Sequence, residues 1–367
     1  MSRDNNFLGF NDFIWFNGVV EDRQDPQKLG RVRVRTLGIH TQDKTVLPTA
    51  DLPWAQCILP VTSAGISGLG QSPSFLVEGT WVFGYFRDGT DCQEPMILGS
   101  LPGKPSELSS PSKGFYDPNG IYPRYKDEVD VNRLAVNGNE PHLSLELRKL
   151  SQVTGIPTAD FDLVSIQDHV GSDIEASDGD TWSQPTIPYN ATYPYNHVYE
   201  SESGHIKEYD DTKGSERIYE AHRTGTSYEI DQDGTKTDII KGDHYNIVYG
   251  KSQALIEGNA DITIGGRHKI YINKNGEENN HYDIQIGPNA SVNIQIDKGD
   301  MNVVLKDGKL NTNVAGDYNM KVGGNYNLDV RGDYIETISK TKTSNTTEAV
   351  NHRGKTFKVI ANRIDLN

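Results

Sequence analysis

Five acidic residues in the middle of the chain are of the type that hydrolyses sugar chains. Glycoside hydrolases use two carboxyl groups, an acid and a nucleophile or base, which a folded scaffold holds at a fixed separation. Here the acidic residues lie in turn-rich sequence without a regular pattern, where solvated surface charge is the ordinary role. We therefore expect no catalytic residue and no enzymatic activity. The five are Asp127, Glu128, Asp130, Asp160 and Asp162.

Metal-ligating residue types are present but are not grouped. The segment Asp173–Asp180 is acidic, yet it lacks the regular oxygen spacing and the final glutamate of a calcium loop. Cys57 and Cys92 are too few for a disulfide framework, so free thiols are expected. The histidines of the C-terminal half share no metal spacing; they are His205, His222, His244, His268, His281 and His352. We expect no metal site and no cofactor.

One basic pattern stands out near the N-terminus. Arg31, Arg33 and Arg35 alternate with Val32 and Val34, so a strand here would place three cations on one face. A solvated outer face is the ordinary interpretation, and an interface with another protein is the functional one. The formal net charge of -15 argues against sequence-independent binding of nucleic acid, which requires clustered cations.

The elements around these arginines predict a small barrel. Short strand-like runs, separated by Gly, Pro and Asp, follow one another through residues 1–104. Five short strands suit the OB-fold, whose association with oligonucleotides and saccharides is an analogy of fold alone. The expected strands are Phe13–Val20, Arg31–Leu37, Trp54–Val61, Trp81–Phe86 and Met96–Leu98.

Residues 105–198 change in character. Acidic residues outnumber basic ones, and one short helix is expected over Leu143–Val153 from the spacing of its leucines. This part is predicted to be an irregular, acidic connector. Strands then begin within residues 199–367, over Gly204–Tyr209, Arg217–His222 and Thr226–Ile230.

An eight-residue repeat organises the C-terminal part. An aliphatic head recurs at Ile240, Val248, Ile256, Ile264, Val314, Val322 and Val330. A glycine follows each head by two residues, at Gly242, Gly250, Gly258, Gly266, Gly316, Gly324 and Gly332. Because a strand alternates its faces with period two, the head, the fifth and the seventh positions lie on one face. Each octad is thus expected to be one strand and one corner, where glycine tolerates positive φ.

Octads of this length bury their apolar face only by stacking. Three octads of one chain could close one turn of a monomeric β-helix, or three chains could each give one octad to an intertwined trimer. The period alone leaves both open. Either way the fold class is all-β. No apolar leader is visible at the N-terminus, and no apolar run approaches the ~20 residues of a membrane span.

Several motifs carry a family resemblance. Leu29-Gly30-Arg31-Val32-Arg33-Val34, Leu52-Pro53-Trp54 and Val77-Glu78-Gly79-Thr80 resemble the OB domain of the central baseplate spike of T-even-like contractile-tailed bacteriophages. Glu202-Ser203-Gly204-His205-Ile206 resembles the entry to that family's triple-stranded β-helix, and the valine-glycine octads resemble its shaft.

The resemblance implies a homotrimer, which would select the intertwined closure, a β-prism. It implies a needle in the virion tail baseplate, assembled in the host cytoplasm, that punctures the host outer membrane when the sheath contracts. The barrel would dock on a trimeric hub protein, through a face that includes Arg31, Arg33 and Arg35. Known members carry a lysozyme domain before the shaft, and residues 105–198 are too few for one, so a form without it is expected.

The C-terminal residues resemble the tip of the same family. Arg363, Ile364, Asp365, Leu366 and Asn367 would form a platform for a small PAAR-type tip protein. The other functions considered are a β-helical tailspike enzyme acting on surface polysaccharide or peptidoglycan, a type VI secretion-like spike and a saccharide-binding OB module.

Overall fold

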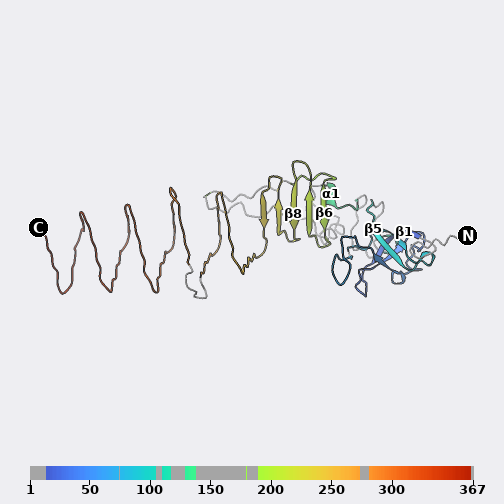
Figure 1. The fold of residues 1–367 in the computed structure, drawn as a ribbon, viewed down its shortest axis with the longest axis horizontal. Helices are drawn as coiled ribbons and strands as arrows, with labels where there is room; N and C mark the ends of the chain where they lie inside the picture. Colours follow the sequence, from blue (N-terminus) through green and yellow to red (C-terminus); the bar gives the residue numbers. More distant parts are fainter. Residues whose placement is uncertain are drawn as a thin grey trace. The chain divides into compact units, whose positions relative to one another are not determined.

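The computed structural model describes most of the chain, and the statements below concern these residues. They are 14–73, 75–104, 110–116, 129–137, 179, 189–272 and 281–364. By its internal contacts the chain divides into two units, residues 1–270 and 271–367, which are described separately. The structure is nearly all-β, as predicted (Figure 1).

The first unit begins with a five-stranded closed barrel. Its order is β1-β2-β3-β5-β4, with every neighbouring pair antiparallel except β3 and β5, which are parallel. The strands are β1 (Ile14–Asp22), β2 (Val32–Thr36), β3 (Trp54–Cys57), β4 (Trp81–Phe86) and β5 (Pro95–Ser100). Two 3-10 turns, η1 (Thr49–Asp51) and η2 (Gly89–Asp91), lie in its loops. The predicted barrel is confirmed.

Alternation along each strand fills the inside of the barrel. On β2 the inward positions are Val32 and Val34, and on β4 they are Val82, Gly84 and Phe86. Gly84 is required by close approach, because a Cβ there would lie 2.0 Å from the carbonyl oxygen of Met96. The buried core consists of Phe16, Val20, Val32, Val34, Ala55, Val82, Phe86 and Ile97.

Several strand ends differ from the sequence prediction, and two of the differences have a visible structural cause. β1 continues to Asp22, through a shift in its register against β2 between Val20 and Asp22. β3 ends at Cys57 rather than at Val61. Pro60 lies in the excess stretch, and proline has no N–H to donate to a sheet ladder.

The connector is described only in pieces. α1 (Arg133–Asn137) is a short helix that the sequence did not predict. Its Leu134 is buried against Ile206, Tyr219 and Ala221 of the sheet that follows. The helix expected over Leu143–Val153 lies outside the described residues.

A second sheet follows in the same unit. It is an antiparallel meander in the order β10-β9-β8-β7-β6. Its strands are β6 (Asn196–Glu200), β7 (Ile206–Asp210), β8 (Arg217–Ala221), β9 (Ser227–Ile230) and β10 (Lys236–Ile239). β6 is not among the strands expected from the sequence; it is a strand because it pairs with β7 along its whole length.

Both faces of this sheet mix charged and apolar side chains. The buried face carries the charged Glu208, Arg217 and Glu229 beside the apolar cluster around Leu134. On the other face Tyr209 lies opposite Ile218, and Ile218 lies opposite Ile230. Tyr209 is 47% exposed and Ile218 is 38% exposed. The single chain thus buries charges on one face and exposes apolar side chains on the other.

The octad region makes no strand with itself. Within residues 241–272 and 281–364 no residue belongs to a hydrogen-bonded strand, and all except Thr263 are exposed. Figure 1 draws residues 281–364, orange to red, as a trace that turns back and forth. The chain bends at each of the seven repeat glycines, so the bends recur every eight residues within each run of octads.

The expected reason for these glycines is not found in the single chain. None of the seven has the positive φ that would require glycine. A Cβ added at any of them would also meet no heavy atom within 4 Å. The conformation of one chain therefore gives no cause for the recurrence of glycine at the corners.

Candidate functional site

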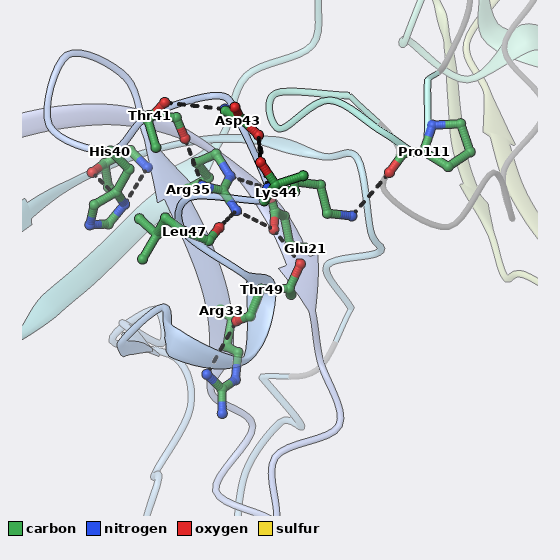
Figure 2. A network of polar contacts seen from close by, with 12 residues as sticks. Glu21, Arg33, Arg35, His40, Thr41, Asp43, Lys44, Leu47, Thr49 and Pro111 are labelled. Carbon is green, nitrogen blue, oxygen red and sulfur yellow. Dashed lines mark hydrogen bonds and ion pairs between the residues drawn. The ribbon is translucent and has the colours of Figure 1, made fainter.

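The most connected polar site of the barrel surrounds Arg35, which Figure 2 shows among its partners. Its guanidinium pairs with Glu21, with 2.5 Å from Nε to Oε1 and 3.1 Å from Nη2 to Oε2. It also donates to the carbonyls of Thr41 at 2.6 Å and Leu47 at 2.7 Å. The side chains of Arg35 and Glu21 are both 0% exposed. One buried cation thus holds the loop between β2 and β3 against β1.

A bulge on β1 explains how Glu21 reaches Arg35. Val19 lies opposite Arg35 and Val20 opposite Val34, and the register then shifts before Asp22. Such an extra residue re-aims the side chains at its position. Val20 and Glu21 are consequently both buried, although they are neighbours in a strand. Thr49 completes the site by donating to Glu21 at 2.7 Å.

Segment 110–116 covers this site from outside the barrel strands. The amide of Gly114 donates to the carbonyl of Gln42 at 2.8 Å, and Lys44 donates to the carbonyl of Pro111 at 3.1 Å. A Cβ on Gly114 would lie 2.2 Å from Cδ of Arg35. Glycine is needed because this segment passes directly over the arginine.

The other two arginines of the predicted basic face also have partners within the barrel. Arg31 forms an ion pair with Asp25 at 2.7 Å, and this pairing holds the pKa of Asp25 well below its ordinary value. Arg33 lies over the ring of Trp54, 4.5 Å from the centroid, and donates to the carbonyls of Ala50 and Leu52. The expected solvated face is wrong for Arg35, and the side chains of Arg31 and Arg33 are only about one fifth exposed.

The loop between β3 and β4 offers a more exposed surface on the barrel. Residues 58–77 contain no charged side chain, in a chain that is 24% charged. Val61 is fully exposed, and Ile66 and Leu69 are about two thirds exposed. The end of the loop lies close to the basic strand, since a Cβ on Gly30 would be 2.1 Å from Pro73.

A second buried ionic cluster lies in the five-stranded sheet. Arg217 on β8 pairs with Glu229 on β9 at 3.1 Å and with Glu208 on β7. Its guanidinium also lies over the ring of Tyr189, 4.4 Å from the centroid. Burial raises the pKa of Glu208 and of Glu229 above the ordinary value of 4.5, and Arg217 opposes that rise. This cluster could not be predicted from the sequence, because its charged members meet only through strand register.

The predicted shaft residues are open in the single chain. The seven octad heads are between 43% and 62% exposed. They lie on a backbone whose N–H and C=O groups join no strand within 241–272 and 281–364. Of the tip residues, Ile364 is 53% exposed, while Asp365, Leu366 and Asn367 lie outside the described residues.

Of the five acidic residues considered for sugar hydrolysis, the structure describes only Asp130. Asp130 exchanges hydrogen bonds with Gly103, since its Oδ2 accepts from the Gly103 amide at 3.0 Å and its own amide donates to the Gly103 carbonyl at 2.8 Å. Asp130 therefore holds the segment before α1 against the residues that follow β5. Asp127, Glu128, Asp160 and Asp162 lie outside the described residues.

The described part of the chain holds no group of three or more metal-ligating side chains. His205 and His222 are close, with ring centroids 4.5 Å apart, and His352 stacks on Phe357 at 5.3 Å. His244 and His268 have no such neighbour among the contacts described. None of the helices found in the described ranges is long and apolar enough to cross a membrane.

The Arg217 cluster predicts how stability changes with pH. A carboxyl whose pKa is higher in the folded state binds its proton more tightly there, so its stabilising contribution is lost as pH rises from 4.5 through the folded pKa. Glu208→Gln, which mimics the protonated group, should raise the melting temperature at pH 8 by a few degrees and raise it less near pH 5, where little of the contribution has been lost. Thermal unfolding of the full chain at both pH values checks this.

Glu220→Gln is the matched control, because Glu220 lies on the exposed face of the same sheet. It should change the melting temperature equally at both pH values. A loss of stability in Glu208→Gln that is as large at pH 8 as at pH 5 would show that pairing with Arg217 outweighs the cost of burial.

The chain resembles known proteins over both of its parts. The model of the Gp5 N-terminal OB domain family matches residues 38–177. Protein Gp5 of Vibrio phage KVP40 is 38% identical over an alignment of 298 residues, which covers 73% of this chain and 67% of that protein. Pre-baseplate central spike protein Gp5 of Enterobacteria phage T4 is 46% identical over 119 residues, which are 31% of this chain and 20% of that protein.

The first alignment, of 298 residues, is too long to lie within the barrel and connector alone. It therefore includes octads, and the barrel seen in the structure agrees with the domain that the family model describes. By its barrel, its family match and this identity, the chain belongs to the Gp5 protein family.

Proposed function

We propose that the chain is the structural central spike of a phage contractile-tail baseplate, a homotrimer whose C-terminal part is a triple-stranded β-helix. The observation that carries this proposal is the octad region, in which apolar heads are exposed and backbone groups join no strand. Backbone polar groups and large apolar rows require partners in a stable protein. Two further copies of the same octads supply both.

The repeat glycines support the same assembly. Neither φ nor crowding within one chain explains them. In an intertwined shaft the corners of three chains pass close to one another, and a residue without Cβ allows the closest approach. A monomeric β-helix would instead place the glycines against other octads of the same chain, where the structure has open space.

The barrel is proposed to dock on a separate hub protein. The charge-free loop of residues 58–77 supplies exposed apolar side chains, and Arg31 lies beside its end through the contact of Gly30 with Pro73. Apolar side chains at the centre and arginine at the side are the usual composition of a protein interface. Arg35 contributes to this surface indirectly, by holding the barrel together.

At the other end, residues 363–367 are proposed to form the platform for a PAAR-type tip protein. The last octads of three chains would end there with exposed backbone that needs a cover. Contraction of the sheath would drive the capped shaft through the host outer membrane. The work is mechanical, so the chain needs no catalytic group of its own.

The trimer is tested through one octad head. Val322→Asp would place three carboxylates near the axis, at a cost of at least several kcal/mol for each buried charge. We expect the unchanged protein to have the mass of a trimer by light scattering and the variant to fail to form one.

Asn327→Asp is the matched control, because Asn327 takes the sixth place of the same octad and faces outward. It adds the same charge without loss of the trimer. A monomeric unchanged protein, or a Val322→Asp variant that assembles normally, would contradict the shared-turn architecture.

The absence of enzymatic activity is tested by a zymogram with peptidoglycan. We expect no clearing by the purified chain, because the proposed function uses no acid–base pair. Clearing that disappears after a single Asp or Glu substitution within residues 125–180 would overturn the proposal.

The docking surface is tested by hub binding. Val61→Ser with Leu69→Ser removes exposed apolar contact, and Arg31→Ser with Arg33→Ser removes the basic side. Both double variants should weaken capture of the cognate hub by roughly tenfold or more, the loss expected when interface residues are truncated. Capture is compared between samples that contain the same amount of folded barrel, as measured by circular dichroism.

Ile58→Ser serves as a control for the loop variant, since the amide of Ile58 is bonded to Ile97 at the base of the loop. It should have a smaller effect on capture. Unchanged capture by both double variants would move the hub interface to another face of the barrel.

A further inference from the structure

The eight-residue period continues beyond the last repeat glycine. After Gly332 the chain bends again at Ser339-Lys340 and at Thr347-Glu348, eight and sixteen residues after the bend at Arg331-Gly332. Ile338 and Thr346 thus take the place of the octad heads. The Thr-rich stretch of residues 337–347, which follows the glycine-containing octads, thus keeps the bend spacing of these octads.

This frame places two opposite charges in positions that are otherwise apolar or aromatic. Glu336 is the seventh residue of its octad, where the two preceding octads have Met320 and Leu328. Lys342 is the fifth residue of the next octad, where the three preceding octads have Tyr318, Tyr326 and Tyr334. Both positions share the parity of the octad heads, which is the face expected to point to the axis.

The two side chains already meet within one chain. Nζ of Lys342 contacts Oε2 of Glu336 across the bend at Ser339-Lys340. This ion pair raises the pKa of Lys342. The side chains are still 61% and 34% exposed, so the single chain leaves much of this pair to be covered by something else.

We propose that Glu336 and Lys342 form a ring of ion pairs inside the shaft, shared by three copies of this chain. The inference rests on the proposed trimer. Three carboxylates and three ammonium groups balance each other in one layer around the axis. The occupants that cover each pair are the other two copies, because their equivalent positions carry the same two opposite charges.

Such a layer solves a problem that identical octads create. Three chains of similar octads can slip past one another by one repeat and still place an apolar head in every layer. The charged positions of the three chains lie beside one another, rather than beside apolar positions, only when all three chains are in the same register, and a buried polar residue is a known means of fixing register. The ring therefore selects one alignment of the three chains, at a cost in stability.

A double-mutant cycle on the full chain tests the ring. Glu336→Gln and Lys342→Gln each leave the opposite charge buried without its partner, and each should lower the melting temperature of the trimer by about 5 °C or more. The double variant with both changes should lose less than the two single losses together. Light scattering establishes in each case that the protein measured is a trimer.

A second variant keeps the test independent of folding failures. Glu336→Leu with Lys342→Tyr installs the residues of the preceding octads at these places, and it should melt as high as the unchanged protein or higher. Lys321→Gln with Asp329→Asn is the control, because both take the outward eighth place of their octads. It should leave the melting temperature unchanged.

The outcomes separate the ring from the trimer itself. The ring is overturned, and the proposed function still stands, in two cases. In the first, the protein is a trimer and the losses of melting temperature of the two single variants add in the double variant. In the second, the single variants melt like the outward control. An unchanged protein that is monomeric overturns both.

Discussion

The backbone of the octad region constrains everything else in this molecule. From residue 241 onward the described chain bends every eight residues within each run of octads and joins no strand of its own, so its N–H and C=O groups find no strand partner within the chain, and the proposed trimer would supply one. The chain therefore combines two kinds of folding. The barrel and the five-stranded sheet form within one chain, whereas in the proposed trimer the octads would acquire secondary structure only through assembly. In that trimer the folded N-terminal part would hold three chains together before the shaft forms.

Two buried arginines organise the barrel and the five-stranded sheet. Arg35 and Arg217 each meet carboxylates that are remote in sequence, and each pair is inaccessible to water. Their energetic roles differ. Arg35 has one carboxylate and two carbonyls, which satisfy its guanidinium and tie a loop to the barrel. Arg217 faces two carboxylates, so its site carries excess negative charge and is sensitive to protonation. The Arg35 site is therefore suited to fixing the conformation of a barrel loop. The Arg217 site instead makes the stability of the sheet depend on the protonation of its carboxylates.

Local alternation and turn residues were enough to predict the barrel. β4 lies at Trp81–Phe86 as expected, because a continuous apolar run is bounded there by Gly79 and the turn at Asp88-Gly89. The burial of the arginines and the identity of their partners could not be predicted in this way. Arg35 is buried because a bulge on another strand turns Glu21 toward it, and the sequence shows no sign of that bulge. The same holds for Arg217, whose partners come from β7 and β9. The period located the bends, yet none of the seven repeat glycines has the positive φ that was expected of them.

Because the bends are regularly spaced, the length of the proposed shaft can change in steps of one octad. Removing or adding eight residues between two bends leaves every remaining side chain on its original face, while removing any odd number exchanges the inner and outer faces downstream. Evolution can thus match the reach of such a needle to the envelope of a new host by duplicating or losing whole octads. The barrel and the C-terminal end are untouched by these changes. Reach and attachment are therefore independent traits in this protein.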